Sequence, residues 1–187
     1  MSKSVLIPLQ VIEFLGVILD SVNMTVTLPA GKITKIKNLG KSLLRKQMTS
    51  ILELASFIGQ VVFASIAVPQ APLRYKYLEI IHNMALVRSR GDYKAEVCLD
   101  EHARNMIAWW VTNLHSQRKP LRSSPPTAEL QTDASLTGWR AKLGTVVTGG
   151  HWDVVELDHI TCLELKAVLL GLKSLCKDFS NTHIRLR

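Results

Sequence analysis

The segment 161–175, TCLELKAVLLGLKSL, limits the folds open to this chain more than any other stretch of the sequence. Thr161 precedes Glu164 by three residues, which is the spacing of a capping box at the start of a helix. The apolar residues that follow would cover such a helix on nearly every side. A helix of this kind must be buried, and we expect it to pack against a sheet.

The residues before this helix predict that sheet. Apolar and polar residues alternate through 130–133, which is the period of a strand, and this strand should end near Asp133. Ser135 and Gly138 then supply residues typical of a turn. We expect two further strands after the turn, 139–147 and 151–156, separated by a break at Gly149 and Gly150. The predicted unit is a meander followed by one packed helix.

This arrangement predicts a pair of carboxylates, Asp133 at a strand end and Glu164 in the first turn of the helix. Hard cations such as Mg²⁺ prefer oxygen ligands and are commonly held by one or two carboxylates together with substrate phosphates. The same residues also have purely structural roles, because Asp often forms turns and Glu at this position often caps a helix. From spacing alone, both interpretations remain open.

The strings TDASLTGW and HITCLELKAVLLGL, with Trp152 and Glu156 between them, resemble the first half of a ribonuclease H domain. The domain is of the kind fused to reverse transcriptases of DIRS-type (tyrosine-recombinase) retrotransposons. The resemblance implies that Asp133 and Glu164 are the first two metal-binding, catalytic carboxylates, and that Ser135 and Gly138 line the same site. It implies Mg²⁺ or Mn²⁺ as cofactor, weakly bound if at all. Arg140 differs from the family, which usually has glycine after the tryptophan.

The N-terminal part resembles the same reverse transcriptases. Residues 11–28 predict a β-hairpin that turns at 20–23, and its strings EFLGVILD and MTVTLP resemble the primer grip at the end of the polymerase palm. Predicted helices at 51–68, 73–88 and 100–115, with the strings AVP and AWW, resemble the thumb and connection. Ser50 or Thr49 and then Asp100 should cap the first and last of these helices.

A basic amphipathic helix is predicted from Lys32 to Gln47. Its apolar stripe is accompanied by six basic residues, and no acidic residue occurs between Ser21 and Leu52. Gly40 should weaken or kink its middle. The basic residues either form a solvated face or contact nucleic-acid phosphates. The candidate nucleic-acid-binding residues are Lys32, Lys35, Lys37, Lys41, Arg45 and Lys46.

We therefore predict an α+β chain in four parts. These are a hairpin domain (1–30), a helical thumb-like region (31–118), a linker (119–127) and a truncated ribonuclease H-like domain with a mixed sheet and one packed helix (128–187). The leading hypothesis is a reverse-transcriptase-derived fragment that binds an RNA/DNA hybrid or duplex. The sequence contains no YxDD-like polymerase motif, and its resemblance ends before the third catalytic carboxylate, so enzymatic activity is an open question.

Two alternatives remain. One is a Mg²⁺-dependent hybrid endonuclease whose site is completed by oligomerisation, and the other is a helical adaptor for acidic proteins. The net charge of +8, carried mainly by residues before Pro120, favours a polyanionic partner.

Three cysteines without a CxxC pair, and no signal peptide, indicate an intracellular protein of nucleus or cytoplasm that is not secreted. Segment 51–68 carries polar residues, so we expect no membrane partner. The oligomeric state is not predicted.

Overall fold

The computed structural model describes residues 7–122 and 125–187 and confirms the α+β class. The chain forms two compact units, 1–122 and 123–187, referred to here as unit 1 and unit 2. Residues 1–6 of the predicted hairpin domain and residues 123–124 of the predicted linker lie outside the described residues. The hairpin and helical regions, predicted as two domains, share one apolar core in unit 1.

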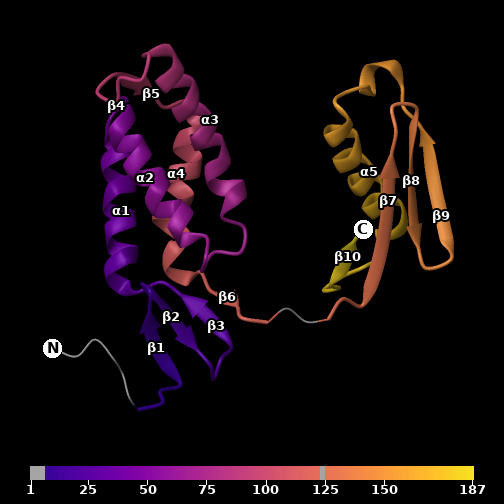
Figure 1. Ribbon diagram of the computed structural model, residues 1–187, viewed down its shortest axis with the longest axis horizontal. Helices are drawn as coiled ribbons and strands as arrows, with labels where there is room; N and C mark the ends of the chain where they lie inside the picture. The colour runs from indigo at the N-terminus through magenta and orange to yellow at the C-terminus, as the bar shows by residue number, and fades with distance from the viewer. Residues whose placement is uncertain (1–6, 123–124) are drawn as a thin grey trace. The chain divides into compact units, whose positions relative to one another are not determined.

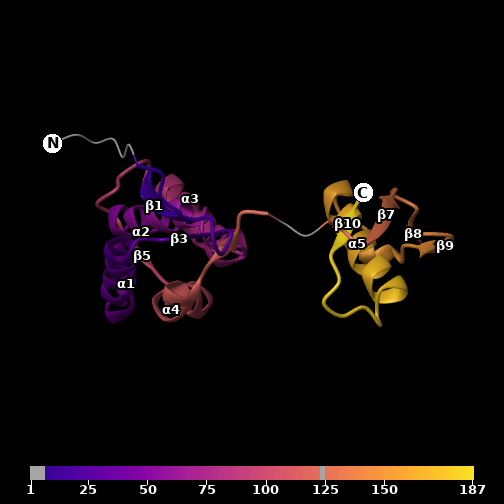
Figure 2. The same ribbon diagram turned by 90° about the horizontal axis from the view of Figure 1, so that it is seen from below.

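Unit 1 has a helical part and a small antiparallel sheet (Figures 1 and 2). The sheet has the order β1-β2-β3-β6, and a two-stranded sheet pairs β4 with β5. The strands are β1 (Val11–Phe14), β2 (Val17–Asp20), β3 (Thr25–Thr27), β4 (Met48–Ser50), β5 (Glu96–Cys98) and β6 (Lys119–Pro120). The helices are α1 (Ala30–Arg45), α2 (Ile51–Ala64), α3 (Pro72–Arg88) and α4 (Glu101–Asn113), followed by a 3-10 turn, Leu114–Ser116.

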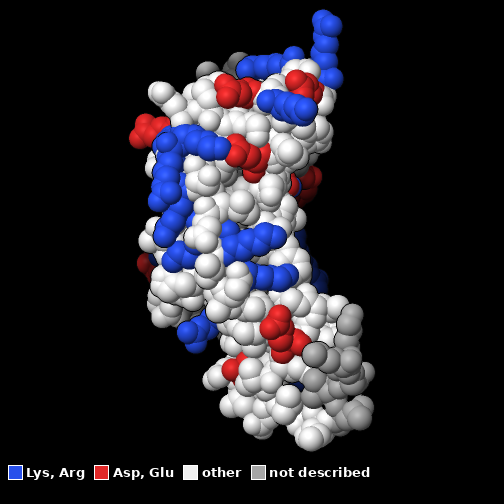
Figure 3. Space-filling model, turned by 90° about the vertical axis from the view of Figure 1, so that its left-hand side faces the viewer, with Lys and Arg blue, Asp and Glu red and all other residues white. Residues whose placement is uncertain are grey.

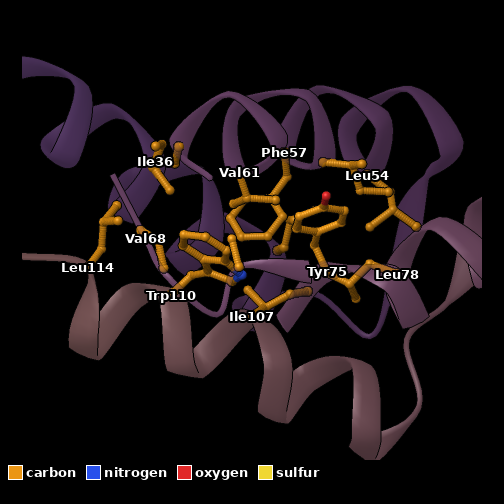
Figure 4. Packing of buried hydrophobic residues seen from close by; sticks show 14 of the residues in the cluster. Ile36, Leu54, Phe57, Val61, Val68, Tyr75, Leu78, Ile107, Trp110 and Leu114 are labelled. Atoms are coloured by element: carbon orange, nitrogen blue, oxygen red, sulfur yellow. The ribbon is translucent and has the colours of Figure 1, made fainter. Parts of the chain in front are cut away.

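The core of unit 1 lies between the helices. Figure 4 shows Trp110 of α4 pointing toward Phe57 and Val61 of α2, and all three side chains are fully buried. The indole Nε1 of Trp110 donates a hydrogen bond of 3.0 Å to the carbonyl oxygen of Arg74, so burial leaves this polar group satisfied. Long-range packing of this kind gives the helices one common core.

Helix caps in unit 1 follow the sequence. The hydroxyl of Ser50 accepts a hydrogen bond from the Glu53 N–H, and the Glu53 carboxylate accepts one from the Ser50 N–H, which completes a capping box. Asp100 caps α4 by accepting a hydrogen bond of 2.8 Å from the N–H of Ala103. Both predicted caps are therefore present.

Two predictions for unit 1 were wrong. The predicted hairpin is a three-stranded meander, because Leu15 and Gly16 both have positive φ angles, 48° and 77°, and make an additional two-residue turn. Leucine rarely adopts this conformation, so the sequence gave little sign of it. Helix α1 also runs through Gly40 without interruption, because Gly40 is where α1 packs closely against other helices.

Unit 2 is a four-stranded mixed sheet with one helix on one face (Figure 1). Its elements are β7 (Ala128–Ala134), β8 (Gly138–Leu143), β9 (Val146–His151), a 3-10 turn (Val154–Glu156), α5 (Ile160–Leu175) and β10 (Ile184–Leu186). The strand order is β10-β7-β8-β9, with β10 parallel to β7 and the other pairs antiparallel. Leu130, Leu163 and Ala167 are fully buried.

Four local predictions for unit 2 were wrong. The predicted strand 139–147 is split by a turn at 144–145, so that its residues belong to β8 and β9. Gly149 and Gly150 lie inside β9 rather than in a break, and 151–156 is mainly a 3-10 turn rather than a strand. Helix α5 begins at Ile160, and its cap is His159, whose Nδ1 accepts a hydrogen bond from the Thr161 N–H, so Thr161 does not form the predicted capping box. The glycines fit the strand because β8 and β9 approach closely there.

Within the described ranges of both units, no helix is long and apolar enough to cross a membrane. The predicted helix 51–68 ends as a regular α-helix at Ala64.

Candidate nucleic-acid interface and carboxylate pair

The outer face of α1 carries a row of basic side chains. Ile36, Gly40 and Leu43 are buried and fix which side of the helix faces the core. Lys37, Lys41 and Arg45 recur every four residues, so they lie along one line of the helix surface, about 6 Å apart along its axis. None of the three forms an ion pair with another described residue. Figure 3, which faces the side of unit 1 where α1 lies, shows Lys and Arg side chains following one another along this surface.

Lys35 is exposed, as are Lys41 and Arg45, whereas Lys37 is half-buried. Lys35 also forms no ion pair with a described residue, but it projects from a different line of α1. Arg104 of α4 lies near the end of the row, where its guanidinium donates hydrogen bonds to the carbonyl oxygens of Leu44 (2.5 Å) and Lys46 (2.9 Å). These bonds satisfy carbonyls left open at the end of the helix. Arg104 therefore adds positive charge beside Arg45, which only the packing of α4 on α1 reveals.

The two remaining candidates of the six are engaged within unit 1. The Lys32 Nζ lies 3.4 Å from the centroid of the Phe63 ring, which is a cation–π contact. The Lys46 Nζ lies 2.6 Å from Oε1 of Glu53. Hydrogen bonds from the Lys46 ammonium and then the Thr49 hydroxyl lower the pKa of the Glu53 carboxyl from 4.5 to about 2. Lys32 and Lys46 thus have structural roles that Lys37, Lys41 and Arg45 lack.

In unit 2, Asp133 and Glu164 lie toward the same end of the layered structure. β7 ends where α5 begins (Figure 1), with Asp133 near the end of the strand and Glu164 in the second turn of the helix. Both side chains are exposed. Among the described residues, no group of three or more His, Cys, Asp or Glu side chains is arranged to hold a metal ion.

The strand register places Asp133 on the sheet face opposite α5. A Cβ at Gly171 of α5 would lie 3.4 Å from Leu130 and 3.3 Å from Thr132, so these two residues face the helix. Successive residues of a strand face opposite sides, and Asp133 therefore faces away from it. Its cross-strand neighbour on that face is Arg140. The carboxylate thus has a cation as its neighbour in the sheet, although the two side chains do not form an ion pair.

Ser135 and Gly138 build the turn after β7. The Ser135 hydroxyl accepts hydrogen bonds of 3.2 Å from the N–H groups of Thr137 and Gly138, and the Ser135 N–H donates to the Gly138 carbonyl at 2.9 Å. A Cβ at Gly138 would lie only 2.5 Å from the carbonyl oxygen of Gly150. The Ser135 hydroxyl thus stabilises the turn, and the close approach of β9 requires glycine at position 138, whether or not a ligand binds nearby.

The open sheet face also carries residues that the sequence analysis did not select. A shallow concavity of about 720 Å³ is lined by Asp133, Arg140 and His151, among others. Lys142 and Asp133 line a second hollow of about 280 Å³ beside it. The sequence does not give the register of β7 with β8. With that register, the alternation of side chains along the strands places Arg140 on the same face as Asp133.

No protein-family model matches the sequence, and no curated protein matches it. The chain is similar to solved structures of a foamy viral protease-reverse transcriptase. The complex with dsDNA has a TM-score of 0.47 and 17% identity, covering 94% of this chain and 36% of that chain. The complex with an RNA/DNA hybrid has a TM-score of 0.47 and 16% identity, covering 95% and 23%. The form described as dRH, with dsDNA, has a TM-score of 0.46 and 16% identity, covering 94% and 30%. This chain thus spans 23% to 36% of their length, and at these values the similarity does not assign it to a family.

Proposed function

We propose that this chain binds nucleic acid, an RNA/DNA hybrid or a duplex, through the row formed by Lys37, Lys41 and Arg45, as a part of a reverse transcriptase of the DIRS type. The row itself is the observation that carries the proposal. Its side chains are held on one line by a buried helix face, and no described carboxylate neutralises them. Their spacing of about 6 Å along the helix lets the three side chains contact different phosphates.

A salt titration tests this proposal. If four side chains, the row and Lys35, contact phosphates, the logarithm of affinity should fall against the logarithm of salt concentration with a slope of about 3 to 4. Changing Lys37, Lys41 and Arg45 together to Gln should lower that slope by about 2.7, since each lost phosphate contact removes roughly 0.9. Fluorescence anisotropy with a labelled hybrid and a labelled duplex gives both affinities.

The control removes the same charge elsewhere in unit 1. Arg88, Lys94 and Arg118 are exposed and make no ion pair with a described residue, so their triple change to Gln also lowers the net charge by three. This control should keep nearly the wild-type slope. Equal slopes for the two triple variants would locate binding elsewhere, and tighter binding of an acidic protein than of either nucleic acid would favour the adaptor function.

The residues of unit 2 are poorly suited to bind two divalent cations, Mg²⁺ or Mn²⁺, side by side. Asp133 faces away from α5, Arg140 is its cross-strand neighbour, and no third carboxylate joins Asp133 and Glu164 among the described residues. The residues present therefore support no catalytic step through a metal ion. Weak binding of Mg²⁺ or Mn²⁺ by these two carboxylates, and nuclease activity completed by oligomerisation, remain proposals that the cleavage assay described below tests.

A further inference from the structure

A groove between α3 and β5 has no part in the proposed nucleic-acid interface. Its volume is about 520 Å³, and its α3 wall has Ile80, Ile81, Met84 and Ala85 at the centre, between Tyr77 and Arg88. Ile80 is 53% exposed and Met84 is 49% exposed, although large apolar side chains are usually buried. The groove therefore presents an apolar wall to solvent in unit 1.

The second wall is the outer edge of β5. Val97 of β5 lies opposite Thr49 of β4. Two residues away along each strand, the Ile51 N–H donates a hydrogen bond of 3.0 Å to the Ala95 carbonyl, so Ile51 and Ala95 are a hydrogen-bonded pair. Hydrogen-bonded pairs alternate along an antiparallel ladder, so Val97 bonds to β4 while the N–H and C=O groups of Glu96 and Cys98 point away from it. These outward groups have no partner in the described protein. A row of unpaired backbone groups of this kind is a template for another strand.

The two faces of β5 differ in chemistry. Val97 and Leu99 are buried on the face that packs in the core with α3. Glu96, Cys98 and Asp100 alternate with them and are exposed. The Asp100 carboxylate accepts hydrogen bonds from the Tyr77 hydroxyl and the Ala103 N–H. Two carboxylates, those of Glu96 and Asp100, therefore line the groove, and Arg88 is the only cationic residue among those that line it.

We propose that this groove binds an extended peptide as an added strand beside β5. The occupant has apolar side chains at alternate positions, directed to the wall formed by Ile80 and Met84. Its other side chains are basic and lie across from Glu96 and Asp100. Backbone hydrogen bonds to the open edge give affinity, and the alternate side chains give specificity. This interaction is with a peptide or protein segment and is independent of nucleic-acid binding by α1.

Two matched peptides test the charge preference with the full chain. The first is acetylated and amidated Val-Lys-Val-Lys-Val, and the second replaces both lysines by glutamate. The net charge of +8 would make the acidic peptide the better non-specific ligand. The groove predicts the opposite, with the lysine peptide binding at least about tenfold more tightly by fluorescence anisotropy. Equal binding, or tighter binding of the glutamate peptide, overturns the proposal.

Variants on α3 locate the binding site. Ile80→Gln with Met84→Gln should weaken binding of the lysine peptide by about tenfold or more. Leu73 and Val87, which are 69% and 79% exposed on the same helix, do not line the groove and provide the control pair, Leu73→Gln with Val87→Gln. An equal loss of peptide affinity in the two double variants would show non-specific hydrophobic binding along α3 and contradict the proposal.

The strand edge needs its own test. Cys98→Pro removes an outward N–H without breaking a bond to β4, and proline is tolerated on such edges. Binding should fall, and in the wild-type chain the amide signals of residues 96 and 98 should shift when the peptide is added. A lysine peptide N-methylated on its backbone makes the same test without altering the protein. Unchanged amide signals, or full binding of the methylated peptide, overturn strand addition.

Discussion

At the residue scale, the Glu53 carboxylate joins three neighbouring parts of unit 1. It accepts hydrogen bonds from the Lys46 Nζ (2.6 Å) after α1, from the Thr49 hydroxyl (2.8 Å) in β4 and from the Ser50 N–H (3.3 Å) at the start of α2. These bonds favour the ionised form, which is why the pKa of Glu53 falls to about 2. The side chain is exposed, so its contribution is screened by salt.

This pKa predicts a pH dependence of stability. A carboxyl whose pKa is lower in the folded state contributes stability above its unfolded pKa of 4.5, and that stability is lost as the pH falls toward 2. Glu53→Gln should therefore lower the free energy of unfolding at pH 6 and change it much less at pH 2.5, as measured by urea denaturation. The difference between the two pH values should shrink in high salt. The same loss at both pH values would mean that the charge of Glu53 is not the cause.

At the element scale, the closeness of α1 to its neighbours depends on Gly40. A Cβ there would lie 2.6 Å from Cγ2 of Val111 in α4 and 3.3 Å from the Phe57 ring in α2. Gly59 of α2 is also within a helix, but no atom lies within 4 Å of a Cβ at that position. The two glycines therefore have the same helix propensity and opposite packing environments.

Gly40→Ala should destabilise unit 1 despite its better helix propensity. Forcing a methyl group into a packed site costs roughly 1–3 kcal/mol, which exceeds the gain of up to about 1 kcal/mol from replacing glycine in a helix. Gly59→Ala should instead stabilise by up to about 1 kcal/mol. Denaturant midpoints measure both. If Gly40→Ala stabilised the protein as Gly59→Ala does, α4 would be free to move away from α1.

At the scale of the whole molecule, the two units have separate apolar cores and separate candidate functions. Unit 1 carries the basic row and the peptide groove. Unit 2 carries the carboxylate pair on a sheet with one face covered by α5 and the other exposed. Binding and cleavage of nucleic acid are therefore expected to be separable.

The full chain should cleave an RNA/DNA hybrid at or near background. Two-metal hydrolysis requires cations about 4 Å apart, and holding both takes more carboxylates than Asp133 and Glu164 provide. A gel assay of a labelled hybrid in Mg²⁺ and in Mn²⁺ checks this, with Asp133→Asn and Glu164→Gln as controls. Robust cleavage that either substitution abolishes would show that the site is completed by residues from elsewhere.

Sequence periodicity and end signals determined most of the elements by themselves. The caps Ser50 and Asp100, the helices of unit 1 and the strand that ends near Asp133 follow from local preferences that act over a few residues. Local signals failed where a distant contact decided the conformation. Gly40 marks a close approach to α4 instead of a kink, and Gly149 and Gly150 belong to a strand because β8 lies beside them.

In the candidate sites, too, some features are present in the sequence and others depend on tertiary contacts. The basic character of α1 is a property of the sequence, but tertiary contacts decided that Lys32 binds the Phe63 ring and Lys46 pairs with Glu53. They leave the row of the half-buried Lys37 and the exposed Lys41 and Arg45 without such contacts. The spacing of Asp133 and Glu164 is likewise in the sequence, whereas the register of β7 with β8 decided which face Asp133 occupies and that Arg140 lies beside it. Register depends on pairing between strands, and a shift of one residue would move every side chain to the other face. That is why only the tertiary structure could settle it.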